Sequence, residues 1–389
     1  MHRTHRTHLH DVIESPLVQI ATIAESIPGA LKLCYGEPDL PTPRFICEAA
    51  HEAALAGHTF YTHTAGDAEL RQAIADKIFE LHRVRYAPSE IMATTGATLA
   101  IYAAIRAFVG AGDNALVISP AYAIFSNGVI MSGGQPRPVP LARSGRHFHL
   151  DLDRIRASID ARTRMLIVNS PSNPTGWVIT EEEQRALVAL ADEHNLVLLA
   201  DEVYERLIYD GRTIAPSFAR VETNRERLIV VNSFSKTYNM TGWRLGWAQT
   251  AEPTIKSMYT AVEFMTSNPA AMIQRAGIAA LRDGEPHIAN LRAQYVQRRE
   301  QVMQAVGSLP GVSLPTPQGA FYAFPKVSAA SDSSAFTAAL VKQTGVALAP
   351  GVAFGGDGEG YIRVCFASTE ATLAEAMSRL RNFVTAARL

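Results

Sequence analysis

A lysine stands among hydroxyl-bearing residues at the end of an apolar run. The run RLIVVN at 227–232 continues into SFSKTYNMTGWRLGW, which places Lys236 just after Ser233 and Ser235. In an open α/β sheet, ligands bind beyond the carboxyl ends of the strands, so this lysine is expected to face a ligand. A lysine removed from water has a lowered pKa and can form a Schiff base with an aldehyde. By itself the segment fits a solvated strand end equally well.

An aspartate ends another apolar run. The residues NLVLLA at 195–200 lead directly into Asp201, and Tyr204 follows three positions later. A buried aspartate needs a cationic partner. A protonated pyridine nitrogen is such a partner, and the carboxylate would keep that ring protonated and a strong electron sink. We therefore expect Asp201 to serve the same site as Lys236.

Two further segments offer groups for an oxyanion and for a phosphate. The run MLIVN ends in NSPSNPTG, a rigid turn in which the amide of Asn173 can bind a phenolate, although any tight turn has this composition. In TTGATLAIYAAI, Gly96 and Thr98 open an apolar-faced helix. Its N-terminus can hold a phosphate or can be a plain N-cap. The hydroxyls beside Lys236 and the forked guanidinium of Arg244 can complete a phosphate site.

The elements that must position these groups alternate along the chain. The runs at 115–119, 164–169, 195–200 and 227–232 are typical of buried parallel strands. Residues 181–193 predict a helix, since Thr180 precedes them and glutamates occupy the first turn. This alternation indicates an α/β fold with a mostly parallel sheet sandwiched by helices.

A second, smaller unit is expected after the large one. Beyond Arg298 the pattern becomes helix-rich, with a Pro/Gly turn at 309–319, a strand-like AFYAFP, and a closing strand and helix, which indicates an α+β domain. A chain of 389 residues that is 47% hydrophobic suits two domains. We predict an N-terminal segment, 1–40, that joins the small domain, a large ligand-binding domain at 41–285 and a small domain at 286–389.

Composition excludes several classes of partner. Lysine and arginine number 36 against 37 acidic residues, so the chain lacks the positive field that nucleic acids and anionic membranes require. The longest mostly apolar stretch, 97–111, contains Arg106 and is too short to span a bilayer. The three cysteines include no CxxC pair, which argues against disulfides and thiolate metal sites and favours a reducing cytoplasm.

The N-terminus is rich in histidine. It lacks the apolar core of a signal peptide or an anchor. Histidines can bind metal, but a solvated chain end is the simpler interpretation, and no metal is predicted. The histidines concerned are His2, His5, His8 and His10.

In their order and spacing, the four motifs resemble the class I/II aminotransferases of the aspartate aminotransferase superfamily, fold type I of the pyridoxal-phosphate enzymes. Further landmarks are GEPDLPTP from residue 36, YTHTAG from 61, APGVAFG from 349 and YIRVCFAS from 361. The resemblance covers nearly the whole chain. It implies pyridoxal 5′-phosphate as cofactor, and amino acids and 2-oxo acids as substrates.

The resemblance also assigns roles to individual residues. Lys236 would hold the cofactor as a Schiff base and shuttle the proton, and Asp201 would pair with the pyridine nitrogen. Asn173 and Tyr204 would contact the phenolic oxygen, and Tyr122 would stack on the ring. The residues implied to hold the phosphate are Gly96, Ala97, Thr98, Ser233, Ser235 and Arg244.

The remaining roles concern the substrate and a second subunit. Arg363 would grip the α-carboxylate of the substrate, with help from the Gly36 backbone and Asn173. Tyr61 would reach the phosphate of the neighbouring subunit's cofactor, which makes a homodimer with shared sites part of the prediction. The implied reaction is transfer of an amino group from an L-amino acid to a 2-oxo acid by a ping-pong mechanism.

Other activities on the same scaffold stay open. A C–S β-lyase would use the same fold and cofactor, but Tyr204 stands in DEVY where related lyases usually carry histidine. A non-catalytic sensor usually adds a DNA-binding domain, and only 35 residues precede the GEPD motif. No second arginine is identified for a side-chain carboxylate, and Phe321 and Tyr322 could line an apolar pocket. The donor's side chain therefore stays open.

Overall fold

A computed structural model describes residue 12 and residues 15–386. The four histidines of the N-terminus lie outside the described residues. Among the residues described, none of the helices combines the length and the apolar character that crossing a bilayer requires.

The large part of the molecule is built on a seven-stranded sheet. Strand β10 runs antiparallel to both of its neighbours, and the other adjacent strands are parallel. The mostly parallel sheet expected from the sequence is therefore confirmed. In sheet order the strands are β2 (Ile91–Thr94), β10 (Gly246–Gln249), β9 (Leu228–Ser233), β8 (Val197–Asp201), β7 (Thr163–Asn169), β3 (Asn114–Ser119) and β4 (Gln135–Pro140).

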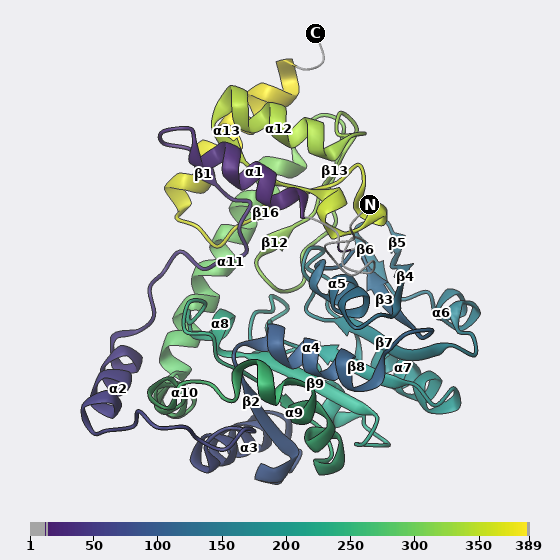
Figure 1. Ribbon diagram of the computed structural model, residues 1–389. Helices are drawn as coiled ribbons and strands as arrows, with labels where there is room; N and C mark the ends of the chain where they lie inside the picture. Colours follow the sequence, from purple (N-terminus) through teal and green to yellow (C-terminus); the bar gives the residue numbers. More distant parts are fainter. Residues whose placement is uncertain (1–11, 13–14, 387–389) are drawn as a thin grey trace, which may run out of the picture.

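Both faces of this sheet are buried, which explains the continuous apolar runs. Leu198 faces one hydrophobic core and its neighbour Leu199 faces another on the opposite side. Helix α7 covers the first face, whereas α4, α5 and α9 cover the second, with α4 in front of the strands in Figure 1. The helices of this part are α2 (Arg44–Leu55), α3 (Ala68–His82), α4 (Ala97–Phe108), α5 (Ile124–Met131), α6 (Leu152–Ser158), α7 (Glu181–Glu193), α8 (Phe234–Thr237), α9 (Glu252–Thr266) and α10 (Ala271–Asp283).

Local sequence accounts for the helix predicted at 181–193, which α7 matches. The Thr180 side chain accepts a hydrogen bond from the Glu183 backbone N–H, and the Glu183 carboxylate accepts one from the Thr180 N–H. This capping box satisfies two donors that the first helical turn leaves free.

The smaller part combines three helices with short strands. Its helices are α11 (Glu285–Gly307), α12 (Ser333–Thr344) and α13 (Glu370–Ala386), and α11 and α12 contact a three-stranded sheet. The strand expected across AFYAFP is much shorter, because Pro325 has no N–H to donate to a ladder. The short strands outside the large sheet are β1 (Leu31–Lys32), β5 (Ala142–Ser144), β6 (His147–His149), β11 (Val312–Ser313), β12 (Tyr322–Ala323), β13 (Lys326–Val327), β14 (Val346–Ala347), β15 (Ala349–Pro350) and β16 (Ile362–Cys365).

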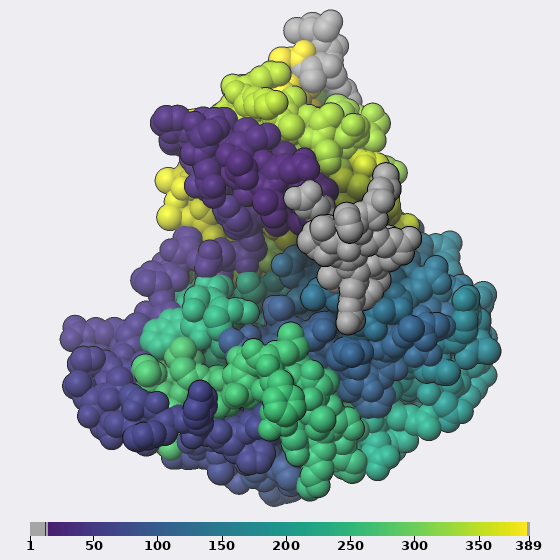
Figure 2. Space-filling model, in the orientation of Figure 1, coloured from purple at the N-terminus to yellow at the C-terminus, as the bar shows by residue number. Residues whose placement is uncertain are grey.

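The N-terminal helix lies against C-terminal elements. Helix α1 (Pro16–Glu25) contacts α12, β14 and β15, and β1 pairs with β14. Figure 2 shows this purple segment packed on the yellow-green C-terminal part. These contacts agree with an N-terminal segment that joins the small domain, and the boundaries at residues 40 and 285 stay predictions.

Candidate active site

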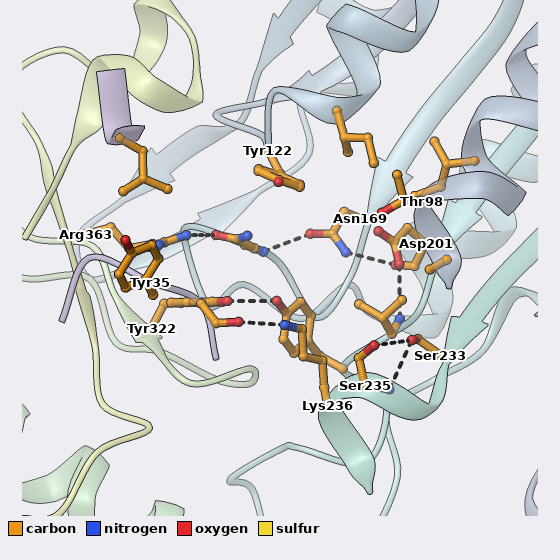
Figure 3. A pocket seen from close by; sticks show the side chains of 18 of the residues that line it. Tyr35, Thr98, Tyr122, Asn169, Asp201, Ser233, Ser235, Lys236, Tyr322 and Arg363 are labelled. Atoms are coloured by element: carbon orange, nitrogen blue, oxygen red, sulfur yellow. Dashed lines mark hydrogen bonds between the residues drawn. The ribbon is translucent and has the colours of Figure 1, made fainter. Parts of the chain in front are cut away.

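A cavity of about 340 Å³ lies at the carboxyl ends of the sheet strands, between the large and small parts (Figure 3). It collects side chains from α1, the loop after β1, α4, β8, β9 and β16. The residues that line it are Leu17, Tyr35, Gly36, Ala97, Thr98, Ile101, Tyr122, Ile124, Asn169, Asn173, Asp201, Val203, Tyr204, Ser233, Ser235, Lys236, Arg244, Tyr322 and Arg363.

Lys236 extends into this cavity from a single helical turn. The turn α8 follows β9 directly, and Ser233 caps it by accepting a hydrogen bond from the Ser235 N–H at 3.1 Å. The Lys236 Nζ donates to the Gly36 carbonyl oxygen at 2.6 Å. Burial lowers the pKa of this amine from 10.5 to about 8. About a tenth of the amine is therefore neutral, and nucleophilic, at pH 7, far more than for a solvated lysine.

Asp201 ends β8 with its carboxylate buried. The carboxylate accepts a hydrogen bond from the Val203 N–H at 3.1 Å, and burial raises its pKa from 3.8 to about 7. Within the described part of the chain, no lysine, arginine or histidine forms an ion pair with it. A buried carboxylate without a cation fits a protonated ring nitrogen.

A chain of amides joins Asp201 to the far end of the cavity. Strands β7 and β8 pair so that Asn169 lies beside Asp201. The Asn169 Nδ2 group donates to the Asp201 carbonyl at 3.0 Å, and its Oδ1 accepts from the Asn173 N–H at 2.8 Å. The Asn173 Oδ1 accepts from Arg363 at 2.8 Å, which leaves the Nδ2 group of Asn173 to donate to an anionic oxygen (Figure 3).

Arg363 is buried on β16, with only 1% of its surface exposed. Its guanidinium lies 4.5 Å from the ring centroid of Tyr322 and 4.8 Å from that of Phe354, and it also donates to the Cys34 carbonyl. Its Nε has no partner, and no carboxylate among the described residues pairs with it. A buried cation of this kind fits an incoming carboxylate.

Two tyrosines meet beside Lys236. The hydroxyls of Tyr204 and Tyr322 lie 2.8 Å apart, and burial raises the pKa of both phenols. A Cβ atom at position 36 would lie 2.3 Å from the Tyr322 hydroxyl oxygen, so glycine is required there. The loop after β1 thereby brings the Gly36 carbonyl to Lys236.

A cradle for an anion lies at the N-terminus of α4. Ala97 and Thr98 open the helix at the cavity, and unpaired N–H groups of a helix N-terminus attract anions. Gly96 has a φ of +77°, and a Cβ atom there would lie 2.3 Å from the Arg244 Nη2. The hydroxyls of Ser233 and Ser235, 3.0 Å apart, face the same end of the cavity in Figure 3.

The structure brings together most of the side chains that the sequence singled out. Gly96 supports the cradle from outside the lining, and Tyr61 lies away from the cavity with 90% of its surface exposed. Sequence reasoning missed Asn169, although it is a polar residue at a strand's carboxyl end, which is the signal that identified Asp201. It also missed Leu17 and Tyr35, which no local pattern marks.

Comparisons with known proteins identify the family of this chain. A family model described as aminotransferase class I and II matches residues 28–380. The aromatic-amino-acid aminotransferase 2 of Thermococcus litoralis is 35% identical, covering 98% of each chain. The aspartate aminotransferase of Pyrococcus abyssi is 35% identical over 96% of this chain and 97% of its own.

Solved structures show the same fold. The aspartate aminotransferase from Thermus thermophilus with maleate matches with a TM-score of 0.91 and 32% identity, over 98% of this chain and all of that one. The family model matches most of the chain, and the two relatives are covered over nearly their whole length. The chain belongs to the class I and II aminotransferases.

Proposed function

We propose that this aminotransferase uses pyridoxal 5′-phosphate to move an amino group from an L-amino acid to a 2-oxo acid in two half-reactions. The observation that carries the proposal is one cavity with three complementary groups. Lys236 is a buried amine of lowered pKa, Asp201 a buried carboxylate that forms no ion pair with a described residue, and Arg363 a buried guanidinium that likewise forms none. A cofactor with an aldehyde and a basic ring nitrogen, together with an amino acid, satisfies all three.

The cavity residues divide the task of holding the cofactor. Asp201 pairs with the ring nitrogen, and Asn173 and Tyr204 donate to the phenolic oxygen. Tyr122, which lines the cavity and is 45% exposed, covers the ring face (Figure 3). The residues that hold the phosphate are Gly96, Ala97, Thr98, Ser233, Ser235 and Arg244.

Lys236 carries the proton in each half-reaction. When bound, pyridoxal phosphate supplies an aldehyde that links to amines and a ring that takes up the electron pair left on the α-carbon. The free Lys236 amine would take the proton from the α-carbon of the amino acid, hold it at Nζ and return it in the same half-reaction. A general base works best when its pKa is near the working pH, and a pKa of about 8 meets that condition.

Arg363 orients the amino acid. The α-carboxylate of the amino acid would bind the Arg363 guanidinium, and the Asn173 amide and the Gly36 backbone would lie beside it. The rings of Tyr322 and Phe354 fix the plane of the guanidinium, so little conformational entropy is lost when the carboxylate binds. This arrangement holds the α-carbon next to Lys236.

A homodimer would complete the site. Phe60, Tyr61 and Phe264 are exposed by 82, 90 and 94%, which is unusual for large apolar side chains unless a partner covers them. Their segments are joined, because the ring of His63 packs edge-on against Tyr259 of α9. The hydroxyls of Thr95 and Thr266 lie 3.4 Å apart, so this surface borders the anion cradle.

Shared sites can be tested by complementation. A Lys236→Ala chain retains Tyr61, and a Tyr61→Ala chain retains Lys236. Mixing the two variant proteins under conditions of subunit exchange should raise activity above that of either variant alone, because one site of each heterodimer then has both residues. No gain in activity on mixing would contradict a site shared between subunits.

The rival activities are not favoured. The relatives described above are named aminotransferases, and Tyr204 occupies the position where the lyase motif carries histidine. Release of pyruvate and ammonia from cysteine or cystathionine without a 2-oxo acid acceptor would instead favour a lyase. A protein that binds no cofactor would favour a sensor.

The three cysteines favour a reducing, cytoplasmic setting. Cys34 and Cys365 are buried free thiols and Cys47 is exposed and free. Cell fractionation with an antibody against the chain tests this location.

The decisive test is a pair of half-reactions. The cofactor-loaded protein is mixed with single L-amino acids, and then with 2-oxoglutarate or pyruvate, while the absorbance of the bound cofactor is followed. We expect an amino acid to shift the absorbance and a 2-oxo acid to restore it. Lys236→Ala should abolish both changes. Wild-type turnover by Lys236→Ala would overturn the mechanism.

A further inference from the structure

The cavity contains few cations for a negatively charged substrate. Among the described residues that line it, the lysines and arginines are Lys236, Arg244 and Arg363. Each already has a partner under the proposed function: the cofactor aldehyde, the cofactor phosphate and the substrate α-carboxylate, respectively. None remains for a second carboxylate on the substrate's side chain.

Apart from the groups assigned to the cofactor and the α-carboxylate, the lining is mostly apolar. Leu17 from α1 and Ile124 from α5 contribute aliphatic side chains, and Tyr35 and Tyr122 contribute aromatic rings. The Tyr35 hydroxyl donates to Glu25 at 3.1 Å, so its polar end is already engaged. In Figure 3, Tyr35 lies next to Arg363, at the end of the cavity opposite the serines of the anion cradle.

The surface proposed to meet a second copy offers no cation in its two exposed apolar segments. The two segments that carry the exposed apolar surface, residues 58–64 and 263–268, contain no lysine or arginine. Glu263 is the one carboxylate there, and the other side chains are histidine, hydroxyl, amide, methionine or aromatic. These two segments therefore provide no positive charge for a carboxylate on the substrate's side chain.

We infer that the amino donor has an uncharged apolar or aromatic side chain, and that Leu17 is a specificity-determining residue. The inference rests on the proposed function and names its donor class. Aspartate would leave a carboxylate desolvated without a cation, whereas phenylalanine, leucine or methionine would bury apolar surface against Leu17 and Ile124. A buried carboxylate without a cation disfavours one substrate over another more strongly than a difference of one methylene group does.

The test compares donors on the cofactor-loaded wild-type protein. The rate of the first half-reaction is measured against concentration for phenylalanine, leucine, methionine, aspartate and glutamate. We expect kcat/KM for the best apolar donor to exceed that for aspartate by at least ~100-fold. An equal or higher value for aspartate would overturn the inference while leaving the aminotransferase function intact. No response to any donor would instead overturn the proposed function.

A matched pair of variants tests Leu17 directly. Leu17→Arg places a cation in the lining, whereas Val18→Arg places one on the same helix at a side chain that is 58% exposed and outside the lining. Leu17→Arg should raise the ratio of kcat/KM for aspartate over phenylalanine by at least ~10-fold, and Val18→Arg should leave the ratio unchanged. Equal ratios in both variants, with normal cofactor absorbance, would overturn the role of Leu17.

Discussion

The Asp201 carboxylate should lower the folding stability of the cofactor-free protein, and it should raise the activity of the cofactor-loaded protein. Burial raises its pKa from 3.8 to about 7, which corresponds to roughly 4 kcal/mol against the charged form. Between these two pH values the folded state keeps a proton that the unfolded state has lost, so stability falls as pH rises from about 4 to about 7. Above pH 7 the full cost remains.

Replacing Asp201 with asparagine removes this charge and keeps the shape. An amide oxygen can still accept the hydrogen bond from the Val203 N–H. Without cofactor at pH 8, the free energy of unfolding of the Asp201→Asn variant should therefore exceed that of the wild type by up to about 4 kcal/mol. Near pH 4 the two free energies of unfolding should be equal. With cofactor, kcat/KM should fall on the order of 10²- to 10³-fold, because the ring nitrogen loses its anionic partner.

Urea unfolding of the cofactor-free proteins at pH 4 and pH 8, beside steady-state kinetics, measures both effects. Glu202→Gln is the control. Glu202 is equally buried, its pKa is raised to about 8, and it accepts from the Phe218 N–H, but it does not line the cavity. The Glu202→Gln variant should be more stable than the wild type at alkaline pH, and its kcat/KM should be unchanged. An Asp201→Asn variant that is less stable than the wild type at pH 8, or fully active, would refute the reasoning.

Three further results are expected. Arg363→Gln should raise KM for every amino donor on the order of 10- to 100-fold with the cofactor still bound, and an unchanged KM in steady-state kinetics would remove Arg363 from substrate binding. Gly96→Ala should weaken cofactor binding and lower the folding stability by roughly 1–3 kcal/mol, since a left-handed φ and the Arg244 guanidinium both oppose a side chain at this position. Cofactor titration and thermal unfolding measure the two effects, and wild-type values in both would contradict the prediction. Cofactor-free protein should react with a small aldehyde at Lys236 with a midpoint near pH 8, because the neutral amine appears as pH rises through its lowered pKa, whereas a midpoint near pH 10.5 would indicate a solvated lysine.

Local sequence was sufficient to predict the groups at the ends of the central strands. Each of Lys236, Asp201 and Asn173 follows an apolar run closely, and parallel strands bring their carboxyl ends to one edge of a sheet. Burial on both sheet faces makes those runs continuous, so the strands were visible without any alignment. The helix at 181–193 was equally predictable, because its capping box lies within four residues of sequence.

Tertiary structure alone decided how the far end of the cavity is built. Arg363 binds Asn173 across 190 positions and the Cys34 carbonyl across 329, and no periodicity in either segment encodes such a contact. The resemblance to a family pointed to Arg363, but nothing in the sequence indicated that Tyr322 and Phe354 hold its guanidinium or that Leu17 lines the cavity. These contacts arise where the small part of the molecule and α1 pack over the sheet edge. The sequence therefore determined the chemistry next to Lys236, whereas packing between distant segments decided what surrounds the substrate's side chain.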